Sequence, residues 1–341
     1  MTRLFAPGPR NLITDVAGIA VGQAEDRAVR TGVTVVSAPG RAVAAVDVRG
    51  GGPGTRETEA LAADCLVDAV DAVVLAGGSV YGLEAASGVA AWLGARGRGF
   101  ALGASPLVAP IVPAAILFDL ANGGDKDWGE TPPYRDLGMA AIASAGEEVT
   151  LGNAGAGYGA QAGRLKGGIG SVSVVGPGGI TVGALVAVNS FGSTVMPGSL
   201  RFWAAPFALM DELGPGAPAP DPLAADPYAD SKIGAAPGTN TTIGIVATDA
   251  ELTPAETRRL AIMAQDGYAR AIRPVHTPFD GDTVFALATG RRALAPDLAR
   301  PAALAVLGAL AADAMARAVA RGVYAADSLG AVESYRARLQ R

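Results

Sequence analysis

Two chemically versatile residue types are nearly absent from the chain, which has one cysteine, Cys65, and one histidine, His276, among 341 residues. A single cysteine excludes an intrachain disulfide, and nothing points to an oxidising compartment. A structural zinc site built from His and Cys cannot be assembled from one of each. A Ser-His-Asp triad would have to use His276, and no G-x-S-x-G motif is present to hold its serine. If the protein is an enzyme, we therefore expect its general base to be a group other than histidine.

Charged residues are also scarce, at 17% of the chain, and they sum to a net charge of −5. The basic residues are scattered, so the sequence lacks the basic face that nucleic acid needs and any run suited to a membrane surface. Neither strongly apolar stretch, Val73–Leu93 or Leu107–Leu120, reaches about 18 uninterrupted apolar residues. The segment Met1–Val16 holds two prolines and no sustained apolar core, unlike a secretory signal. We expect a soluble, cytoplasmic protein that binds neither nucleic acid nor membrane.

Small residues are abundant instead. Half of the chain is apolar but only 5% is aromatic, so we expect an interior of small side chains with close backbone approaches. Runs of β-branched residues alternate with Ala-rich stretches, which predicts a layered α/β fold. The predicted strands are Val33–Val36, Val43–Val48, Ala72–Leu75, Val172–Val175, Val182–Val188, Ile243–Thr248 and Val284–Ala288. The predicted helices are Glu57–Val70, Gly82–Leu93, Leu137–Ala145, Pro254–Ile272, Pro301–Ala320 and Ala325–Leu339.

The helix that begins at Pro254 has the clearest start signal. Thr253 can cap it, proline suits its first turn, and Glu256 falls three residues after the cap to complete a capping box.

The composition changes sharply between Glu212 and Asn240, where the chain becomes rich in Pro, Ala, Gly and Asp. Such a stretch buries little, and we expect an exposed, mobile loop. It stops at TTIGIVATDA, which is typical of a buried strand. A mobile segment joined directly to a core strand is what a cleavage junction requires, although any surface loop has the same composition.

Thr241 opens the strand that follows this loop. A threonine at a new N-terminus would carry a hydroxyl nucleophile and an α-amine base on one residue. The free α-amine titrates near 7.7–8.0 in model peptides, which suits a general base at neutral pH. Before cleavage, the hydroxyl can attack the carbonyl of Asn240 in an N-to-O acyl shift, and water then hydrolyses the ester. The alternative is that Asn240-Thr241-Thr242 is a polar turn and a chance N-x-[ST] sequon.

Several sequence blocks, taken in order and spacing, decide between these interpretations. Together they resemble the L-aminopeptidase/D-esterase (DmpA) family of self-processing N-terminal-nucleophile hydrolases, and within it most of all the nylon-oligomer endohydrolases (NylC). The resemblance runs from NLITDVAGIAVGQA to FDGDTVFALATG, over nearly the whole chain. Its most specific blocks are AVDVRGGGPGTRE, LAGGSVYGLEAASGV, GNAGAGYGAQAGRLKGGIG, GALVAVNSFG, NTTIGIVATDAELTPAE and HTPFDGDTVFA.

The resemblance implies roles for residues in these blocks. In GTNTTIG, cleavage falls between Asn240 and Thr241, and Thr241 becomes the nucleophile. In GALVAVNSFG, Asn189 matches an asparagine whose side-chain amide helps to hold the oxyanion; its alternative role is to cap a turn. In SVYGLEA, Tyr81 matches a tyrosine that lines the catalytic pocket; its alternative role is packing.

Three further residues follow from the same resemblance. In RLKGGIG, Lys166 matches a lysine near the nucleophile, which would depress the pKa of the α-amine or stabilise negative charge. In FDGDT, Asp280 and Asp282 match the acidic pair that orients the threonine and its amine. Without the family, Lys166 would be a solvated surface lysine, and Asp280-Gly281-Asp282 a hairpin turn. A calcium site there is disfavoured because the remaining ligands are missing.

One difference from the family pattern bears on which branch of the family the chain resembles. The β-peptide aminopeptidases of the family use Ser-x-Glu where this chain has Asp280-x-Asp282, and serine where it has Thr241. Both differences favour the nylon-hydrolase and less-studied branches over β-aminopeptidase specificity.

The resemblance also implies a fold and an assembly. The fold would be a four-layer α/β/β/α sandwich of the N-terminal-nucleophile (Ntn) hydrolase type. Residues 1–341 would form a single domain, cut into a large chain 1–240 and a small chain 241–341. Cleaved pairs would assemble as homo-oligomers, with a dimer of dimers as one arrangement. We expect an amidase without metal or cofactor, acting on short peptides with a free amine end or on linear ω-amino-acid oligomers.

Three alternatives stay open at this point. One is an aminopeptidase or esterase that releases N-terminal L- or β-amino acids. Another is a nucleotide-binding or sensory module in which the glycine turn of AVVLAGGSVYGLEAASGVAAWL binds phosphate, although the G-x-G-x-x-G spacing is absent and no G-x-x-x-x-G-K-[ST] loop exists. The third is a structural assembly protein that never matures. A binding module would stay whole on a denaturing gel, whereas a mature hydrolase would run as two fragments.

Overall fold

The computed structural model describes residues 5–214, 216, 218, 226, 228, 230–232, 240–294 and 298–341. Most of the segment Glu212–Asn240, for which we predicted an exposed loop, lies outside the described residues. The α-helices are α1 (Glu84–Gly94), α2 (Tyr134–Ala143), α3 (Pro254–Ala271), α4 (Arg300–Ala325) and α5 (Tyr335–Leu339). The strands are β1 (Ala20–Asp26), β2 (Thr31–Val48), β3 (Thr55–Arg56), β4 (Ala69–Ala76), β5 (Phe100–Ala101), β6 (Val108–Ala109), β7 (Ala114–Ile116), β8 (Gln161–Ala162), β9 (Leu165–Lys166), β10 (Gly168–Val175), β11 (Thr181–Asn189), β12 (Thr241–Ala250) and β13 (Thr283–Arg292).

Within the described residues, nine strands share one hydrogen-bonded sheet in the order β10-β11-β12-β13-β2-β4-β7-β3, with β1 paired to β2. The long strand β2 joins its two parts. The first half of β2 pairs with β1 and β4, and its second half pairs with β13. The register shifts between Ser37 and Ala42, around Pro39. A proline cannot donate a ladder hydrogen bond, which suits this position to an irregularity.

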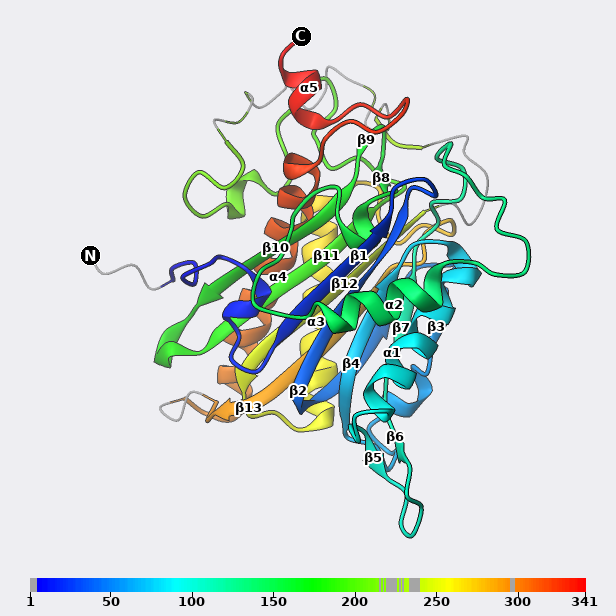
Figure 1. Ribbon diagram of the computed structural model, residues 1–341. Coiled ribbons are helices and arrows are strands. Elements are labelled where there is room, and N and C mark those ends of the chain that lie inside the picture. The colour runs from blue at the N-terminus through cyan, green and yellow to red at the C-terminus, as the bar shows by residue number, and fades with distance from the viewer. Residues whose placement is uncertain are drawn as a thin grey trace.

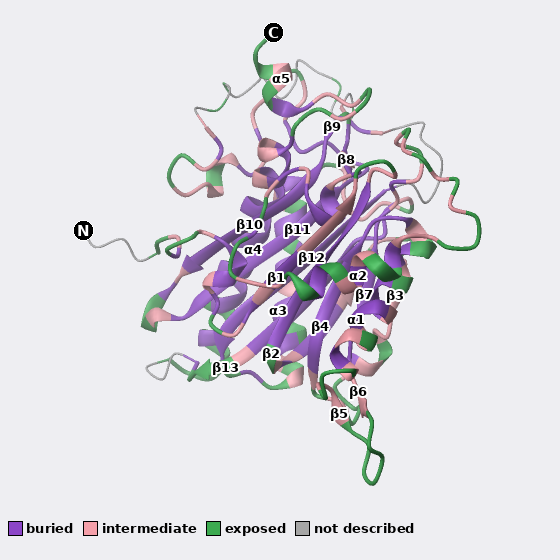
Figure 2. Cartoon of the chain, viewed as in Figure 1, coloured by how far each residue is buried: buried purple, intermediate pink, exposed green. Residues whose placement is uncertain are grey.

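Three buried clusters separate four layers (Figures 1 and 2). The middle cluster lies between the two parts of the sheet, with Leu185, Ile245 and Phe285 on one part and Val36 and Leu75 on the other. The other two clusters pack the outer faces of the sheet against α3 and α4 and against α1 and α2. The fold is therefore the four-layer α/β/β/α sandwich that the sequence resemblance implied.

Alternation along the strands explains why both faces are covered. In β12, Ile243 and Ile245 belong to the middle cluster, whereas Val246 belongs to the cluster under α3 and α4. All ten residues of β12 are buried, so a strand that is apolar on both faces lies in the middle of the sandwich.

The small residues allow the close approaches expected from composition. A Cβ at Gly170 in β10 would lie 1.8 Å from the carbonyl oxygen of Ala318 in α4, so only glycine fits there. Helix α4 is apolar enough to cross a membrane by length and composition, but 67% of its most apolar window is buried inside the protein. It is a core helix of the sandwich.

Two predicted helices were wrong. Over Glu57–Val70 the structure has only a 3-10 helix, Glu59–Leu61, before β4. Glu57 has a positive φ of 59° and Leu66 is 84% exposed, so helix propensity there is not supported by an apolar face to bury.

The predicted helix Ala325–Leu339 is wrong because α4 continues to Ala325 and only Tyr335–Leu339 is helical beyond it. Gly330 has a φ of +59°, and the Ser334 side chain accepts a hydrogen bond from the N–H of Ala337 to start α5. The other four helices and five of the predicted strands are confirmed within about five residues at their ends, whereas Val33–Val36 and Val43–Val48 are parts of the single strand β2.

The start of α3 gives a first testable prediction. The Thr253 side chain accepts from the N–H of Glu256, and the Glu256 carboxylate accepts from the N–H of Thr253, which is the predicted capping box. We expect Thr253→Ala to lower the free energy of unfolding by about 1 kcal/mol, measured by urea denaturation. The matched control is Thr150→Ala, since Thr150 is exposed and bonds Gln23 only through backbone atoms. Equal losses in both variants would contradict the capping role.

Candidate active site

The residues predicted to flank the cleavage point lie inside the protein. Thr241 is the first residue of β12 and is 3% exposed, and Asn240 before it is 1% exposed. Asn240 pairs with Asp280 in an isolated parallel bridge, and Thr241 lies opposite Asn189, the last residue of β11. The junction therefore lies where β12 enters the sheet between β11 and β13.

Two donors meet at the carbonyl oxygen of Asn240. The Thr241 hydroxyl donates to it, so the hydroxyl oxygen lies beside the peptide bond that it would attack. The backbone N–H of Gly281 donates to the same oxygen over 3.1 Å. A preset N–H at a carbonyl oxygen is the arrangement that stabilises an oxyanion.

The Asp280–Asp282 turn is hydrogen-bonded to the segment that directly follows β2. The N–H of Gly52 donates to the carbonyl oxygen of Asp280 over 2.8 Å, and the N–H of Arg49 donates to that of Asp282 over 2.9 Å. A Cβ at Gly50 would lie 2.3 Å from backbone atoms of Asp280 and Asp282, so a side chain cannot be accommodated. This contact explains the first glycine of the triple glycine in AVDVRGGGPGTRE. It also shows that Asp280-Gly281-Asp282 is a backbone-supported loop before β13, and β13 pairs with β12 and β2 rather than forming a hairpin.

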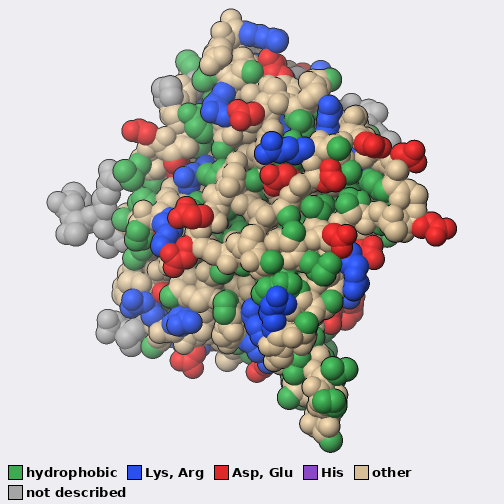
Figure 3. Space-filling view, viewed as in Figure 1, with side chains coloured by type: hydrophobic (Ala, Val, Ile, Leu, Met, Phe, Trp, Pro, Cys, Tyr) green, Lys and Arg blue, Asp and Glu red, His purple; other side chains and the backbone are tan. Residues whose placement is uncertain are grey.

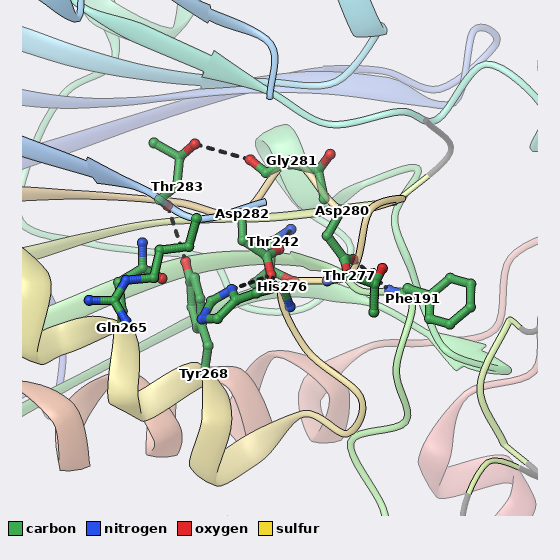
Figure 4. A network of polar contacts seen from close by, with 12 residues as sticks. Phe191, Thr242, Gln265, Tyr268, His276, Thr277, Asp280, Gly281, Asp282 and Thr283 are labelled. Carbon is green, nitrogen blue, oxygen red and sulfur yellow. Dashed lines mark hydrogen bonds and ion pairs between the residues drawn. The ribbon is translucent and has the colours of Figure 1, made fainter. Parts of the chain in front are cut away.

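Asp282 links β12 to His276 (Figure 4). Its Oδ1 accepts from the N–H of Thr242 over 2.8 Å, and its Oδ2 lies 2.9 Å from Nδ1 of His276. The N–H of His276 also donates to Oδ2 over 3.1 Å. An ionised carboxylate only accepts, so this contact with the charged form of Asp282 would need a proton on Nδ1. Asp282 is 1% exposed, and its hydrogen bond to the N–H of Thr242 fixes the residue next to Thr241.

Asp280 is buried beside Asp282 and holds a different loop. Its Oδ1 accepts from the N–H of Phe191, and its Oδ2 accepts from both the N–H and the hydroxyl of Thr277. Burial and the neighbouring charge of Asp282 raise the pKa of Asp280. The charge of Asp282 therefore lies close enough to disfavour the ionised form of Asp280.

A lysine that the sequence did not single out lies near Asp280. Lys232 is partly buried, and its Nζ donates to the carbonyl oxygen of Gln161 over 2.7 Å. Burial lowers the pKa of Lys232 to about 7, and the charge of Asp280 opposes that shift. An amine of this kind can gain or lose a proton near neutrality.

The side-chain amide of Asn189 has a fixed orientation. Its Oδ1 accepts from the N–H of Gln161 over 2.9 Å, and its Nδ2 donates to the carbonyl oxygen of Phe118 over 3.0 Å. The amide nitrogen carries two N–H groups, and Asn189 lies opposite Thr241 in the ladder. The amide is thus held by the neighbouring loops at the level of Thr241.

Lys166 is buried rather than solvated, at 1% exposure. Its Nζ donates to the carbonyl oxygens of Gly157 and Gly167 over 3.1 and 2.7 Å. Burial lowers the pKa of Lys166 to about 7, and the charge of Asp119 opposes that shift. The expectation of a surface lysine, drawn without the family, is therefore wrong.

Tyr81 lies apart from these contacts. It is 47% exposed, in the 3-10 helix Ser79–Leu83, and its ring stacks edge-on against Trp128 at 5.6 Å between centroids. Its role in the pocket stays a prediction.

The structure thus joins Asn189, Asn240, Thr241, Asp280 and Asp282 in one set of backbone and side-chain contacts. Sequence reasoning missed His276 and Lys232. A lone histidine and a lysine in a low-complexity segment carry no spacing signal, although HTPFDGD does place His276 four residues before Asp280.

Comparisons with known proteins show the family of this chain. The model of Peptidase family S58 matches residues 11–336. An uncharacterized aminopeptidase of Mycobacterium bovis is 47% identical over 96% of this chain and 97% of that protein. A 6-aminohexanoate-oligomer endohydrolase of Kocuria sp. is 30% identical over 83% of this chain and 76% of that protein.

Two solved structures share the fold. The L-aminopeptidase D-Ala-esterase/amidase of Ochrobactrum anthropi, described as a new variant among the Ntn hydrolase fold, aligns with a TM-score of 0.69 at 23% identity, over 96% of this chain and 89% of that chain. A Burkholderia sp. β-aminopeptidase aligns with a TM-score of 0.67 at 24% identity, over 97% and 91%. The sandwich described above is accordingly of the Ntn-hydrolase type.

The contact between His276 and Asp282 gives a second prediction. We expect His276→Ala to destabilise the fold by about 1–3 kcal/mol, because a buried carboxylate oxygen loses a donor. Amide hydrolysis should fall as well, since Asp282 also holds Thr242. The matched variant is His276→Asn, which keeps a donor near the Nδ1 position and tolerates the φ of +54° at this residue. Urea denaturation and initial rates check both; equal behaviour of the Ala and Asn variants would contradict the role of Nδ1.

Proposed function

The chain belongs to peptidase family S58 and is an amide-bond hydrolase, and we propose that it matures by cutting its own backbone between Asn240 and Thr241. One observation carries this proposal. The Thr241 hydroxyl contacts the carbonyl oxygen of Asn240 while the N–H of Gly281 donates to that same oxygen. Nucleophile, carbonyl and oxyanion donor are therefore together before any cleavage occurs.

The proposed cut proceeds in two steps. The hydroxyl oxygen of Thr241 attacks the carbonyl carbon of Asn240, and the oxyanion is stabilised by the N–H of Gly281. The C–N bond then breaks, its nitrogen takes a proton and becomes the α-amine of Thr241, and the acyl group stays on the hydroxyl oxygen as an ester. Water hydrolyses the ester, which leaves a carboxylate on Asn240 and a free hydroxyl on Thr241.

The mature enzyme would use the same residue on its substrate. The α-amine of Thr241 accepts the hydroxyl proton as the oxygen attacks a substrate amide, and it returns the proton to the leaving amine. The side-chain amide of Asn189 assists the oxyanion, and Asp280 and Asp282 orient the threonine through the loops that they hold. Tyr81 and Lys166 complete the set on the resemblance alone.

For substrates, we propose short peptides with a free amine end or linear ω-amino-acid oligomers. The second candidate is an aminopeptidase or esterase that releases N-terminal L- or β-amino acids. The name of the 47% identical relative favours aminopeptidase action, and that of the 30% identical relative favours oligomer cleavage. Comparing rates on an aminoacyl p-nitroanilide and on a 6-aminohexanoate oligomer separates the two.

We further propose that the chains 1–240 and 241–341 stay in one domain, that cleaved pairs assemble as homo-oligomers, and that the protein works in the cytoplasm without metal or cofactor. Acidic and basic side chains are interspersed over the face seen in Figure 3. That distribution and the net charge of −5 support a small amide substrate in preference to nucleic acid or a membrane.

Replacing the nucleophile tests the proposal directly. We expect Thr241→Ala to give one uncut polypeptide with no measurable amidase activity, because both the hydroxyl and the new amine are lost. Thr241→Ser keeps a hydroxyl and should still be cut. Denaturing electrophoresis, N-terminal sequencing and initial rates are the measurements. Amide hydrolysis by uncut Thr241→Ala would show that the nucleophile is another residue.

Gly281 gives a separate test of the contact at the carbonyl. A Cβ there would lie 2.7 Å from the Thr241 hydroxyl oxygen and 2.9 Å from the carbonyl oxygen of Gly52. Alanine keeps the backbone N–H, but its Cβ would push the loop away from Thr241, so we expect Gly281→Ala to slow self-cleavage by up to about 100-fold, the cost of losing one oxyanion donor. The control is Gly40→Ala, since a Cβ at Gly40 meets nothing within 4 Å. The fraction cut over time after synthesis is measured; normal cleavage of Gly281→Ala would show that the close contact of this loop with Thr241 is not needed for the cut.

A further inference from the structure

Asp119 is a buried carboxylate to which no role has been given. It follows β7 and is 3% exposed. Its Oδ2 accepts from the hydroxyl of Thr31 over 2.7 Å, and its Oδ1 accepts from the N–H of Gly78 over 2.7 Å. Gly78 belongs to the turn between β4 and the 3-10 helix that carries Tyr81. Asp119 therefore fixes the turn that leads to Tyr81.

The same carboxylate packs against a second glycine-rich loop. A Cβ at Gly159 would lie 2.7 Å from Oδ2 of Asp119, so the two are in close contact. On one side of Gly159, the carbonyl oxygen of Gly157 accepts from Nζ of Lys166. On the other side, the N–H of Gln161 donates to Oδ1 of Asn189. This loop thus holds two of the residues assigned to catalysis.

The residue before Asp119 completes the connection. The carbonyl oxygen of Phe118 accepts from Nδ2 of Asn189 over 3.0 Å. Both ends of the Asn189 amide are therefore held by segments that Asp119 contacts or belongs to. A small shift of the carboxylate would be transmitted to the Asn189 amide, to which we assigned the proposed oxyanion role.

We propose that ionised Asp119 is a positioning residue of the amidase. It holds the loops of Gly78, Gly159 and Phe118 in place, and these loops in turn orient the side chains of Asn189 and Lys166. The inference rests on the proposed function of Asn189. It adds a residue that touches neither the substrate nor Thr241.

The charges around Asp119 make its ionisation responsive near neutral pH. Burial raises its pKa to about 6, while the hydrogen bonds from Thr31 and Gly78 and the charges of Lys126 and Lys166 oppose the rise. Tyr134 is the other titratable side chain that faces it, and burial together with the charge of Asp119 raises the pKa of its phenol. Protonation of Asp119 below about pH 6 would release one of the two donors, so activity should fall as the pH drops through that value.

The first experiment removes the charge and keeps the shape. We expect Asp119→Asn to lower kcat on a p-nitroanilide substrate by about 10- to 100-fold at pH 7.5 with KM nearly unchanged, because the amide cannot accept from both donors. The matched control is Asp71→Asn, a 1% exposed carboxylate that accepts from the N–H of Ile111 at the start of β4. This control should keep the wild-type kcat and pH profile even if it unfolds at a lower temperature.

The second experiment shifts the carboxylate without removing it. Thr31→Val deletes the hydroxyl that lowers the pKa of Asp119, whereas Thr31→Ser keeps it. We expect the acidic limb of the kcat profile to move to higher pH in Thr31→Val and to stay in place in Thr31→Ser. If Asp119→Asn does not fold, the comparison of Thr31→Val with Thr31→Ser still tests the positioning role.

The outcomes separate the two levels of inference. Wild-type kcat in Asp119→Asn, or an unmoved acidic limb in Thr31→Val, would overturn the positioning role while the wild-type enzyme remains cut and active. An uncut wild-type enzyme that hydrolyses amides would instead overturn the proposed function, whatever Asp119 does.

Discussion

The hydrogen bond from the N–H of Gly281 to the carbonyl oxygen of Asn240 is the contact on which the site depends. It exists only because the Asp280–Asp282 turn is fixed from two directions. The N–H groups of the glycines that follow β2 donate hydrogen bonds to the backbone of the turn. The Asp282 carboxylate forms hydrogen bonds with Thr242 and His276. Neighbouring strands thereby bring a donor, a hydroxyl and a peptide bond together.

The site concentrates charge inside an interior built from small apolar residues. Asp280 and Asp119 have raised pKa values because they are buried, and Lys166 and Lys232 have lowered pKa values for the same reason. Burial disfavours the charged form of either sign, so groups that normally titrate far apart move toward neutrality. An enzyme with one histidine can obtain proton donors and acceptors in this way, and its histidine then serves to hold a carboxylate.

The sequence predicted the parts of the molecule whose signal is local. Strands such as Ile243–Thr248 are continuous apolar runs, and Thr253 with Glu256 marks a helix start within four residues. The helix predicted over Glu57–Val70 failed because alanine content favours a helix only where an apolar face is buried. Asn189, Asp280 and Asp282 were predicted as site residues through the family resemblance. His276, Lys232 and Asp119 were missed because their partners are distant in sequence or lie in an unremarkable motif.

The proposed cleavage point lies at the start of β12, a fully buried central strand. Cleavage there would change the equilibrium between the folded and the unfolded protein. Before the proposed cut, folding joins parts of one chain, and its equilibrium does not depend on concentration. After the cut, β12 and β13 belong to one polypeptide and β11 and β2 to another, so the sheet is an interface between two molecules. Refolding the separated pieces would be a second-order process, and mass action would govern it. The proposed cut would therefore turn a protein that folds as one chain into two polypeptides held together by the pairing of β12 with β11 and of β13 with β2.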